Sequence, residues 1–301
     1  MNEQKPEASG KKKKSSWTTW LLVGVMILGA AIMAYPTVSD WWNSFHSTQA
    51  IVSYSKQVEN TDVAKLAAMI DAAHAYNEKL KGKENPYAMS EEELAEYNSL
   101  LDLSGTGLMG YIQIKAINVY IPIYHGTEEN VLQIAVGHLD WTALPVGGEG
   151  THAVLSGHRG LPSAKLFTDL DKVREGDRFT VTVLNQTITY EVDQIRIVEP
   201  GDIKELSAVP GRDYCTLVTC TPYGINTHRM LVRGHRVESE GGQLVVPAEA
   251  IILPNYITIP AVGIPLLFVF LVVMMITTRR KKPKIKASDL AALQDEIEQK
   301  Q

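Results

Sequence analysis

The amino-acid sequence predicts a mostly β domain with N-terminal helices, flanked by two transmembrane helices. Two uncharged apolar runs, at 17–35 and 256–276, are each long enough to cross a hydrocarbon core of about 30 Å. Between them, apolar residues recur first at three-and-four spacing and then, from Gly110, at every second position. Many short strands in one region indicate a closed β-barrel or a sandwich.

Basic residues flank both apolar runs on the sides that face away from the central domain, Lys11–Lys14 before the first and Arg279–Lys286 after the second. Such flanks stay in the cytoplasm, so we expect a two-pass membrane protein with 36–254 outside the cell. A cleaved signal peptide is the alternative for the first run. No small-x-small cleavage site follows that run, so a retained anchor in the lipid bilayer is favoured.

These features predict how the chain is divided. The expected segments are a cytoplasmic basic tail (1–16), a transmembrane helix (17–35), an extracellular helical region (36–108), a β-barrel domain (109–240), a linker (241–255), a second transmembrane helix (256–276) and a cytoplasmic tail (277–301).

The helical region carries two helix signals. Apolar residues at three-and-four spacing, among them Leu66 and Ile70, predict a helix over Asp40–Lys81. The stretch Ser90–Glu93 has the form of a capping box, a hydroxyl followed three positions later by glutamate. It predicts a second helix through Leu94, Tyr97, Leu100 and Leu101. The loop 82–90 would join the two helices.

The alternating pattern that follows predicts strands, because side chains of a strand point to opposite faces in turn. Turns such as "LNQT" and "EPGD" separate them. The predicted strands are 111–124, 151–158, 178–184, 188–198, 214–220 and 229–237.

The chain holds two cysteines, Cys215 and Cys220. They stand five positions apart in one predicted strand, an odd separation that places their side chains on opposite faces. They are also about 16 Å apart along that strand, whereas a disulfide needs Cα atoms within about 7 Å. We therefore expect no bridge. Because the outside of a cell normally oxidises paired cysteines, an unpaired Cys220 at a strand tip indicates a reactive thiol, with Cys215 packed in the core.

A reactive cysteine needs partners of defined kinds. A nearby positive group favours the nucleophilic thiolate, and catalysis also needs a histidine acid or base and an oxyanion donor. His158 ends a predicted strand among glycines, which indicates exposure at a rim, and Arg229 follows Cys220 by nine positions. Taken alone, each residue is more often structural: a buried small hydrophobe, a strand-end histidine and a surface charge.

Other features exclude several classes of function. The formal net charge is −5, and no basic stripe lies on the central part of the chain, which argues against a nucleic-acid partner. We predict neither a metal nor a bound cofactor. Four further histidines are interpreted as structural: His138, His152, His228 and His235.

Joined together, these residues carry a family resemblance. "TLVTC" at Thr216–Cys220, with His228 and Arg229 opening the next strand, resembles the signature of the sortases. "LSGHRGLPSAKLFTDL", "VGHLDWTALPVGGEGTHAV" and "TPYGINTHRMLVRGHR" are similar to the pilin-polymerising class C sortases. The resemblance extends from about Tyr111 to Val237 and includes the two-anchor layout. It implies an eight-stranded β-barrel, with His158, Cys220 and Arg229 as catalytic residues.

The resemblance also implies a reaction and its partners. Cys220 would attack the Thr–Gly bond of an LPxTG-like sorting signal, His158 would transfer protons, and Arg229 would bind the oxyanion. A pilin lysine amine would then resolve the thioester, which builds pili on a Gram-positive cell surface. Two alternatives stay open: a housekeeping sortase that attaches proteins to cell-wall peptide, and a membrane-tethered binding module without chemistry.

Class C sortases often carry a lid before the barrel, with an Asp-Pro-aromatic triplet in the active site. Here Asn85, Pro86 and Tyr87 stand at a comparable place within 82–90. Asn85 offers a neutral hydrogen bond where aspartate would offer an ionic one, so the resemblance implies a lid that is held weakly. An ordinary loop between helices is the alternative.

Overall fold

The structure is a computed structural model that describes residues 16–83, 85, 87–238, 263, 265, 268, 269 and 272. The chain forms two compact units, Met1–Leu253 and Pro254–Gln301. In the second unit the described positions are helical. The rest of the predicted second transmembrane helix (256–276), the linker (241–255), residues 1–15 and the whole predicted C-terminal tail (277–301) lie outside the described residues.

A long helix, α1 (Ser16–Glu59), contains the first apolar run. Within the described part of the chain, its segment Leu21–Glu59 is the one helix long and apolar enough to cross a membrane, a test that a signal sequence also meets. The helix then stops, and α2 (Val63–Lys81) begins after Asp62, whose carboxylate accepts a hydrogen bond from the Ala64 amide at 2.7 Å. The prediction of one helix over Asp40–Lys81 is therefore wrong, because an N-cap starts a new helix there.

The third helix, α3 (Glu91–Ser99), confirms the predicted capping box. Ser90 Oγ accepts from the Glu93 amide at 3.2 Å, and Glu93 Oε2 accepts from the Ser90 amide at 2.7 Å. The helix ends two residues earlier than expected. Leu101 has a φ of 60°, a left-handed conformation that no helix continues through.

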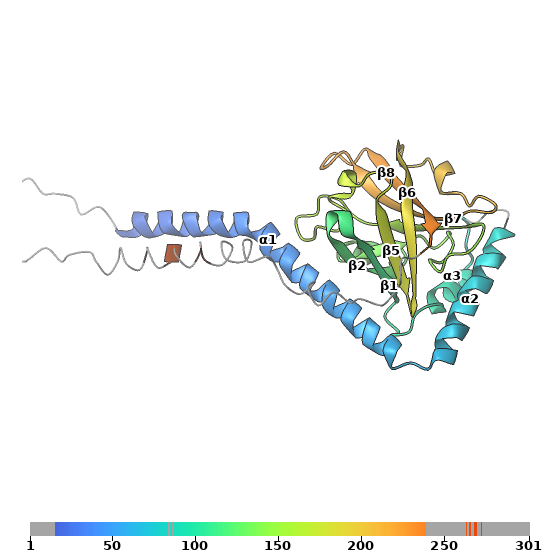
Figure 1. The fold of residues 1–301 in the computed structure, drawn as a ribbon. Helices are drawn as coiled ribbons and strands as arrows, with labels where there is room; N and C mark the ends of the chain where they lie inside the picture. The colour runs from blue at the N-terminus through green and yellow to red at the C-terminus, as the bar shows by residue number, and fades with distance from the viewer. Residues whose placement is uncertain are drawn as a thin grey trace, which may run out of the picture. The chain divides into compact units, whose positions relative to one another are not determined.

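Eight strands form a closed barrel in the order β1-β2-β3-β4-β7-β8-β6-β5, which confirms the barrel that the resemblance implies (Figure 1). Short helical turns lie in its connections: η1 (Lys115–Ile117), α4 (Glu129–Leu132), η2 (Leu170–Lys172) and η3 (Lys204–Leu206). The strands are β1 (Leu108–Ile114), β2 (Val119–His125), β3 (Val136–His138), β4 (Thr151–Ser156), β5 (Arg178–Val183), β6 (Gln186–Val198), β7 (Asp213–Thr221) and β8 (His228–Val237).

Two strand predictions differ from the structure. The predicted strand 111–124 is an antiparallel pair, β1 and β2, joined by η1 and by Asn118 at a φ of 53°. The same alternation continues through both halves, so the sequence pattern does not mark the reversal. Strand β3 was not predicted, because three residues are too few to display a period of two.

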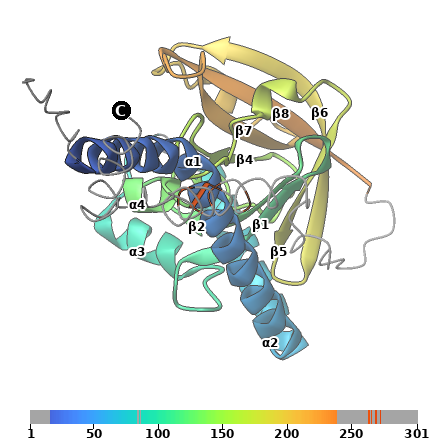
Figure 2. The same ribbon diagram turned by 90° about the vertical axis from the view of Figure 1, so that its left-hand side faces the viewer.

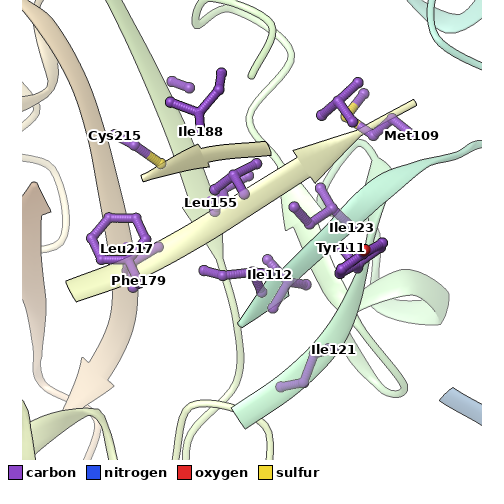
Figure 3. Close-up of a cluster of buried hydrophobic side chains, with 14 of the residues drawn as sticks. Met109, Tyr111, Ile112, Ile121, Ile123, Leu155, Phe179, Ile188, Cys215 and Leu217 are labelled. Carbon is purple, nitrogen blue, oxygen red and sulfur yellow. The ribbon is translucent and has the colours of Figure 1, made fainter. Parts of the chain in front are cut away.

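The part of the barrel that carries the predicted reactive residues consists of β4, β7 and β8. Strand β4 runs parallel to β7, and β8 runs antiparallel to β7 (Figure 2). Inward-facing side chains of these strands, including Leu155, Cys215 and Leu217, enter the main core (Figure 3). Residues of the opposite parity form a second cluster on the outer face: Val154, Val218 and Leu231, with Leu206 of η3. We call it the outer cluster.

Helices α2 and α3 lie beside the barrel (Figure 1) and are joined to its backbone by buried polar side chains. Asn77 of α2 donates to the Leu144 carbonyl at 3.1 Å and accepts from the Leu144 amide at 2.7 Å. The Tyr97 hydroxyl of α3 donates to the His138 carbonyl at 3.2 Å and accepts from the Gly126 amide at 3.1 Å. These bonds satisfy backbone groups that would otherwise be buried without partners.

Replacing Asn77 with alanine is expected to lower the free energy of unfolding by about 2–4 kcal/mol, because both polar groups of Leu144 would lose their buried partner. Urea unfolding of the full-length protein in detergent, followed by circular dichroism, measures the change. Asn60→Ala is the matched control, since the exposed Asn60 side-chain amide donates to the Lys56 carbonyl one helical turn earlier. Equal losses in the two variants would contradict the account of Asn77.

Candidate active site

Cys220 and Arg229 are direct neighbours across the β7–β8 ladder. Cys220 stands one residue before the end of β7, and its register partner on β8 is Arg229. Directly opposite residues of an antiparallel pair share a face, with Cβ atoms about 4.5–5.5 Å apart. The thiol and the guanidinium therefore belong to one face of the sheet, at the end where β7 turns into β8.

His158 reaches the same level from the other side of β7. The last residue pair of the parallel β4–β7 ladder is Ser156 with Val218. The backbone continues this alignment, because the Gly157 amide donates to the Val218 carbonyl at 3.0 Å and Thr219 Oγ1 donates to the Gly157 carbonyl at 2.7 Å. Two residues beyond the last pair, His158 lies level with Cys220. The structure thus brings His158, Cys220 and Arg229 to one end of three adjacent strands.

The two cysteines have opposite environments, as their odd spacing predicts. Both are free, which confirms the expected absence of a bridge between them. Cys215 is fully buried, and this burial raises the pKa of its thiol. It therefore stays protonated and unreactive. Cys220 is partly exposed on the opposite face.

The guanidinium of Arg229 is held by its own turn. Nη1 donates to the Asn226 carbonyl at 3.3 Å and to the His228 carbonyl at 3.1 Å. Among the residues that the structure describes, these are the hydrogen bonds of this guanidinium. A guanidinium carries five N–H donors in a fixed plane, so donors on Nε and Nη2 are left for a ligand.

The imidazole of His158 keeps one nitrogen without a partner. Within the described part of the chain, Nε2 makes no hydrogen bond although solvent does not reach it. Glu129 of α4 lies nearby, with its Oε2 3.8 Å from Nε2, beyond hydrogen-bonding distance. A ring nitrogen without a partner is suited to exchange a proton with a bound substrate.

The outer cluster extends from the Cys220–Arg229 pair along the same face. Val218 precedes Cys220 by two positions on β7, and Leu231 follows Arg229 by two on β8, so all four share a face. Trp141 and Ile203 pack on the cluster from the flanking loops. This cluster was not predicted from the sequence, although apolar residues on both faces of β7 were a signal for it.

The predicted lid segment is described only in part, because Pro86 lies outside the described residues. Asn85 Oδ1 accepts from the Tyr87 amide at 3.2 Å, which caps a local turn. The Tyr87 ring packs edge-on against Trp141 with centroids 4.8 Å apart. Both rings line a cavity of about 180 Å³ with Leu206. Tyr87 therefore lies beside the outer cluster, and its placement over Cys220 stays a prediction.

His138 and His152 have the structural partners expected of them, whereas the buried Nδ1 of His235 has no hydrogen-bond partner among the described residues. His138 is fully buried and bonds to the Ala143 carbonyl at 2.8 Å, and burial lowers its pKa to about 3. His152 bonds to Thr216 Oγ1 at 2.7 Å and to the Ser207 carbonyl at 3.0 Å. In the described part of the chain, no three acidic, histidine or cysteine side chains are arranged to hold a metal ion. That the protein works without a metal or cofactor stays a prediction.

Comparison with known proteins identifies the fold. The Sortase domain family matches residues 112–237. Sortase D of Bacillus subtilis is 29% identical over 131 residues, which is 42% of this chain and 63% of that protein. The chain thus spans somewhat less than two thirds of this curated relative.

Solved structures match over a longer range. Sortase C1 of Streptococcus agalactiae is 52% identical, with a TM-score of 0.63 over 64% of this chain and 100% of that one. A sortase C of Streptococcus pneumoniae, studied for catalysis and pilin substrate specificity, is 42% identical, with a TM-score of 0.58 over 65% and 100%. Both solved chains are class C enzymes, and this chain matches each of them over its whole length. This chain belongs to the sortase family of cysteine transpeptidases, in its class C branch.

Proposed function

We propose that this chain is a membrane-anchored transpeptidase that joins pilin subunits through an LPxTG-like sorting signal. The observation that carries the proposal is the register of β7. It sets Cys220 opposite Arg229, and the continuation of β4 brings His158 level with both. These are the nucleophile, the oxyanion donor and the acid–base group that acyl transfer requires. The sequence similarity to sortase C enzymes supports the same assignment.

In the first half of the reaction, Cys220 Sγ attacks the threonine carbonyl of the signal. Negative charge develops on the carbonyl oxygen, where the donors of Arg229 stabilise it. The Thr–Gly bond then breaks, and His158 gives a proton to the departing glycine amine. The product is a thioester between Cys220 and threonine.

In the second half, a lysine amine of another pilin attacks the thioester. His158 takes a proton from that amine, the new amide bond forms, and Cys220 leaves as the thiolate. His158 and Cys220 are thereby returned to their starting state. The unpaired Nε2 of His158 supports this assignment.

The partly buried apolar residues around the outer cluster fit a substrate of this kind. A sorting signal binds as an extended peptide with leucine and proline ahead of the scissile bond. Val218 and Leu231 are themselves already buried, but the partly buried side chains of Trp141 and Ile203 that pack on their cluster offer apolar surface. Burying such residues on apolar surface contributes about 25 cal/mol per Å².

The membrane attachment rests on α1, whose uncharged stretch follows Lys11–Lys14. With positive residues on the cytoplasmic side, the barrel lies outside the cell, where pilins are assembled. A housekeeping role and a purely binding role are less well supported, because two solved structures matched over their whole length, at 52% and 42% identity, are sortase C enzymes.

Cys220→Ala is expected to abolish the covalent adduct with a sorting-signal peptide, since the thiol that forms the thioester is gone. Mass spectrometry of the full-length protein after incubation with the peptide measures the adduct. Cys215→Ala is the matched control and keeps the adduct, because Cys215 faces the core. An adduct that persists in Cys220→Ala would assign the nucleophile elsewhere.

Arg229→Lys is expected to lose about a hundredfold or more in turnover, the usual effect of losing an oxyanion donor. Lysine keeps the charge but not the planar set of donors. Arg236→Lys is the control, on the same strand but paired with Asp213 at 3.2 Å. Turnover of Arg229→Lys near that of the control would mean that Arg229 supplies charge alone or nothing.

The lid prediction is tested by replacing Asn85 and Tyr87 with alanine together. If the segment covers Cys220, the double variant reacts faster with a small thiol reagent and its thermal midpoint changes little, as for an exposed loop. Asn85→Asp is expected to slow the labelling, because a charged bond to Arg229 is about twice as strong as a neutral one. Identical labelling rates in the wild type and the double variant show that the segment is no lid.

A further inference from the structure

Arg159 links the chain next to His158 with the chain next to Cys220. It follows His158 directly, and its Nη1 donates to Thr221 Oγ1 at 3.1 Å. Thr221 in turn follows Cys220 directly and ends β7. One hydrogen bond therefore joins the residue after the proposed acid–base group to the residue after the proposed nucleophile.

This guanidinium is part of the protein interior. The Arg159 side chain is only 7% exposed. Its Nη2 donates to Asp171 Oδ2 of η2 at 2.6 Å, and the Tyr223 ring of the β7–β8 turn lies 6.0 Å from the guanidinium carbon. A buried cation is unfavourable unless it is paired and hydrogen-bonded. The Asp171 pair and the Thr221 bond meet part of that need and fix the two terminal nitrogens, while the buried Nε has no partner among the described residues.

The Arg159–Thr221 bond lies where backbone pairing ends. The β4–β7 ladder stops at Ser156 and Val218, and two further bonds hold Gly157. His158 stands beyond them, on a loop. Its own backbone carbonyl accepts from the Phe167 amide at 3.1 Å, a bond to the loop and not to β7. The bond from Arg159 to Thr221 thus connects this loop to β7 at a point beyond the last backbone pair of the β4–β7 ladder.

We infer that Arg159 is a positioning residue, which holds His158 at its working distance from Cys220 by bonding to Thr221. The inference rests on the proposed roles of His158 and Cys220. Arg159 itself contacts no reacting atom. Its effect is on proton transfer, since the rate of this step falls steeply when the donor and acceptor are displaced.

The sharpest test removes the acceptor of this bond and leaves Arg159 in place. Thr221→Val is nearly isosteric and eliminates only the hydroxyl. Full-length protein in detergent is assayed with a Leu-Pro-x-Thr-Gly peptide pool, randomised at x, and a lysine-containing acceptor peptide. We expect kcat to fall at least about tenfold, with KM nearly unchanged because the apolar residues around the outer cluster are not altered. Thr221→Ser restores the hydroxyl and is expected to restore kcat.

A matched control separates positioning from stability. Thr182→Val removes a similarly buried hydroxyl, which bonds to Thr187 Oγ1 at 3.0 Å on the β5–β6 pair. It should lower the thermal midpoint at least as much as Thr221→Val does, because its hydroxyl bonds to the Tyr111 side chain as well as to Thr187, and leave kcat unchanged. Arg159→Met is expected to reduce kcat as Thr221→Val does, and the double variant to be no slower, because both changes remove one interaction.

The outcomes separate this inference from the proposed function. If Thr221→Val keeps the wild-type kcat, or if Thr182→Val loses as much, Arg159 has no positioning role while the transpeptidase assignment stands. If the wild type forms no thioester with the peptide pool, the proposed function fails and this inference fails with it. A kcat loss that is confined to Thr221→Val and reversed in Thr221→Ser supports the inference.

Discussion

The alignment of β7 with its two neighbours is the constraint on which the site depends. Backbone hydrogen bonds fix Cys220 opposite Arg229 and fix the approach of His158 from β4. Because side chains alternate along a strand, a slip of one residue would turn Cys220 into the core and bring Cys215 out. The chemistry therefore depends on a pairing register, with each reactive side chain supplied by a different strand or strand end.

Burial on both faces of the sheet holds this register. Inward side chains such as Cys215 and Leu217 fill the barrel core, while Val218 and Leu231 fill the outer cluster. A slip of one residue would turn the inward apolar side chains away from the core and turn outward-facing residues, some of them polar, into it. Partly buried residues that pack on the outer cluster, such as Trp141 and Ile203, provide the apolar surface proposed for the substrate. Past the end of the ladder, the Arg159–Thr221 bond extends the alignment to His158.

The features that were predictable from the sequence are those governed by local patterns. The capping box at Ser90, the opposite faces of Cys215 and Cys220, and most strand positions follow from spacing alone. The break between α1 and α2 was not predicted. Apolar residues continue at helical spacing on both sides of Asp62, so the N-cap formed by this residue does not show in the pattern. Strand β3 is too short to show a period.

The pairing of strands that lie far apart in the sequence could not be predicted from residue patterns. The parallel alignment of β4 with β7 joins segments more than fifty positions apart, and nothing local encodes it. Only the family resemblance grouped His158 with Cys220. For the same reason the partner of Arg159 was not foreseen, since Thr221 is a neighbour through this pairing. The outer cluster likewise becomes visible only when Leu206 and Trp141 are brought onto the sheet.

The register itself can be measured directly by disulfide trapping. In a Cys215→Ala background, Arg229→Cys places a second thiol directly opposite Cys220, within the Cα separation of about 4.4–6.8 Å that a disulfide needs. After mild oxidation, mass spectrometry should show an intramolecular bridge in this variant and not in His228→Cys or Met230→Cys, whose side chains face away. A bridge that forms in either of those two variants instead would show a different register and contradict the account.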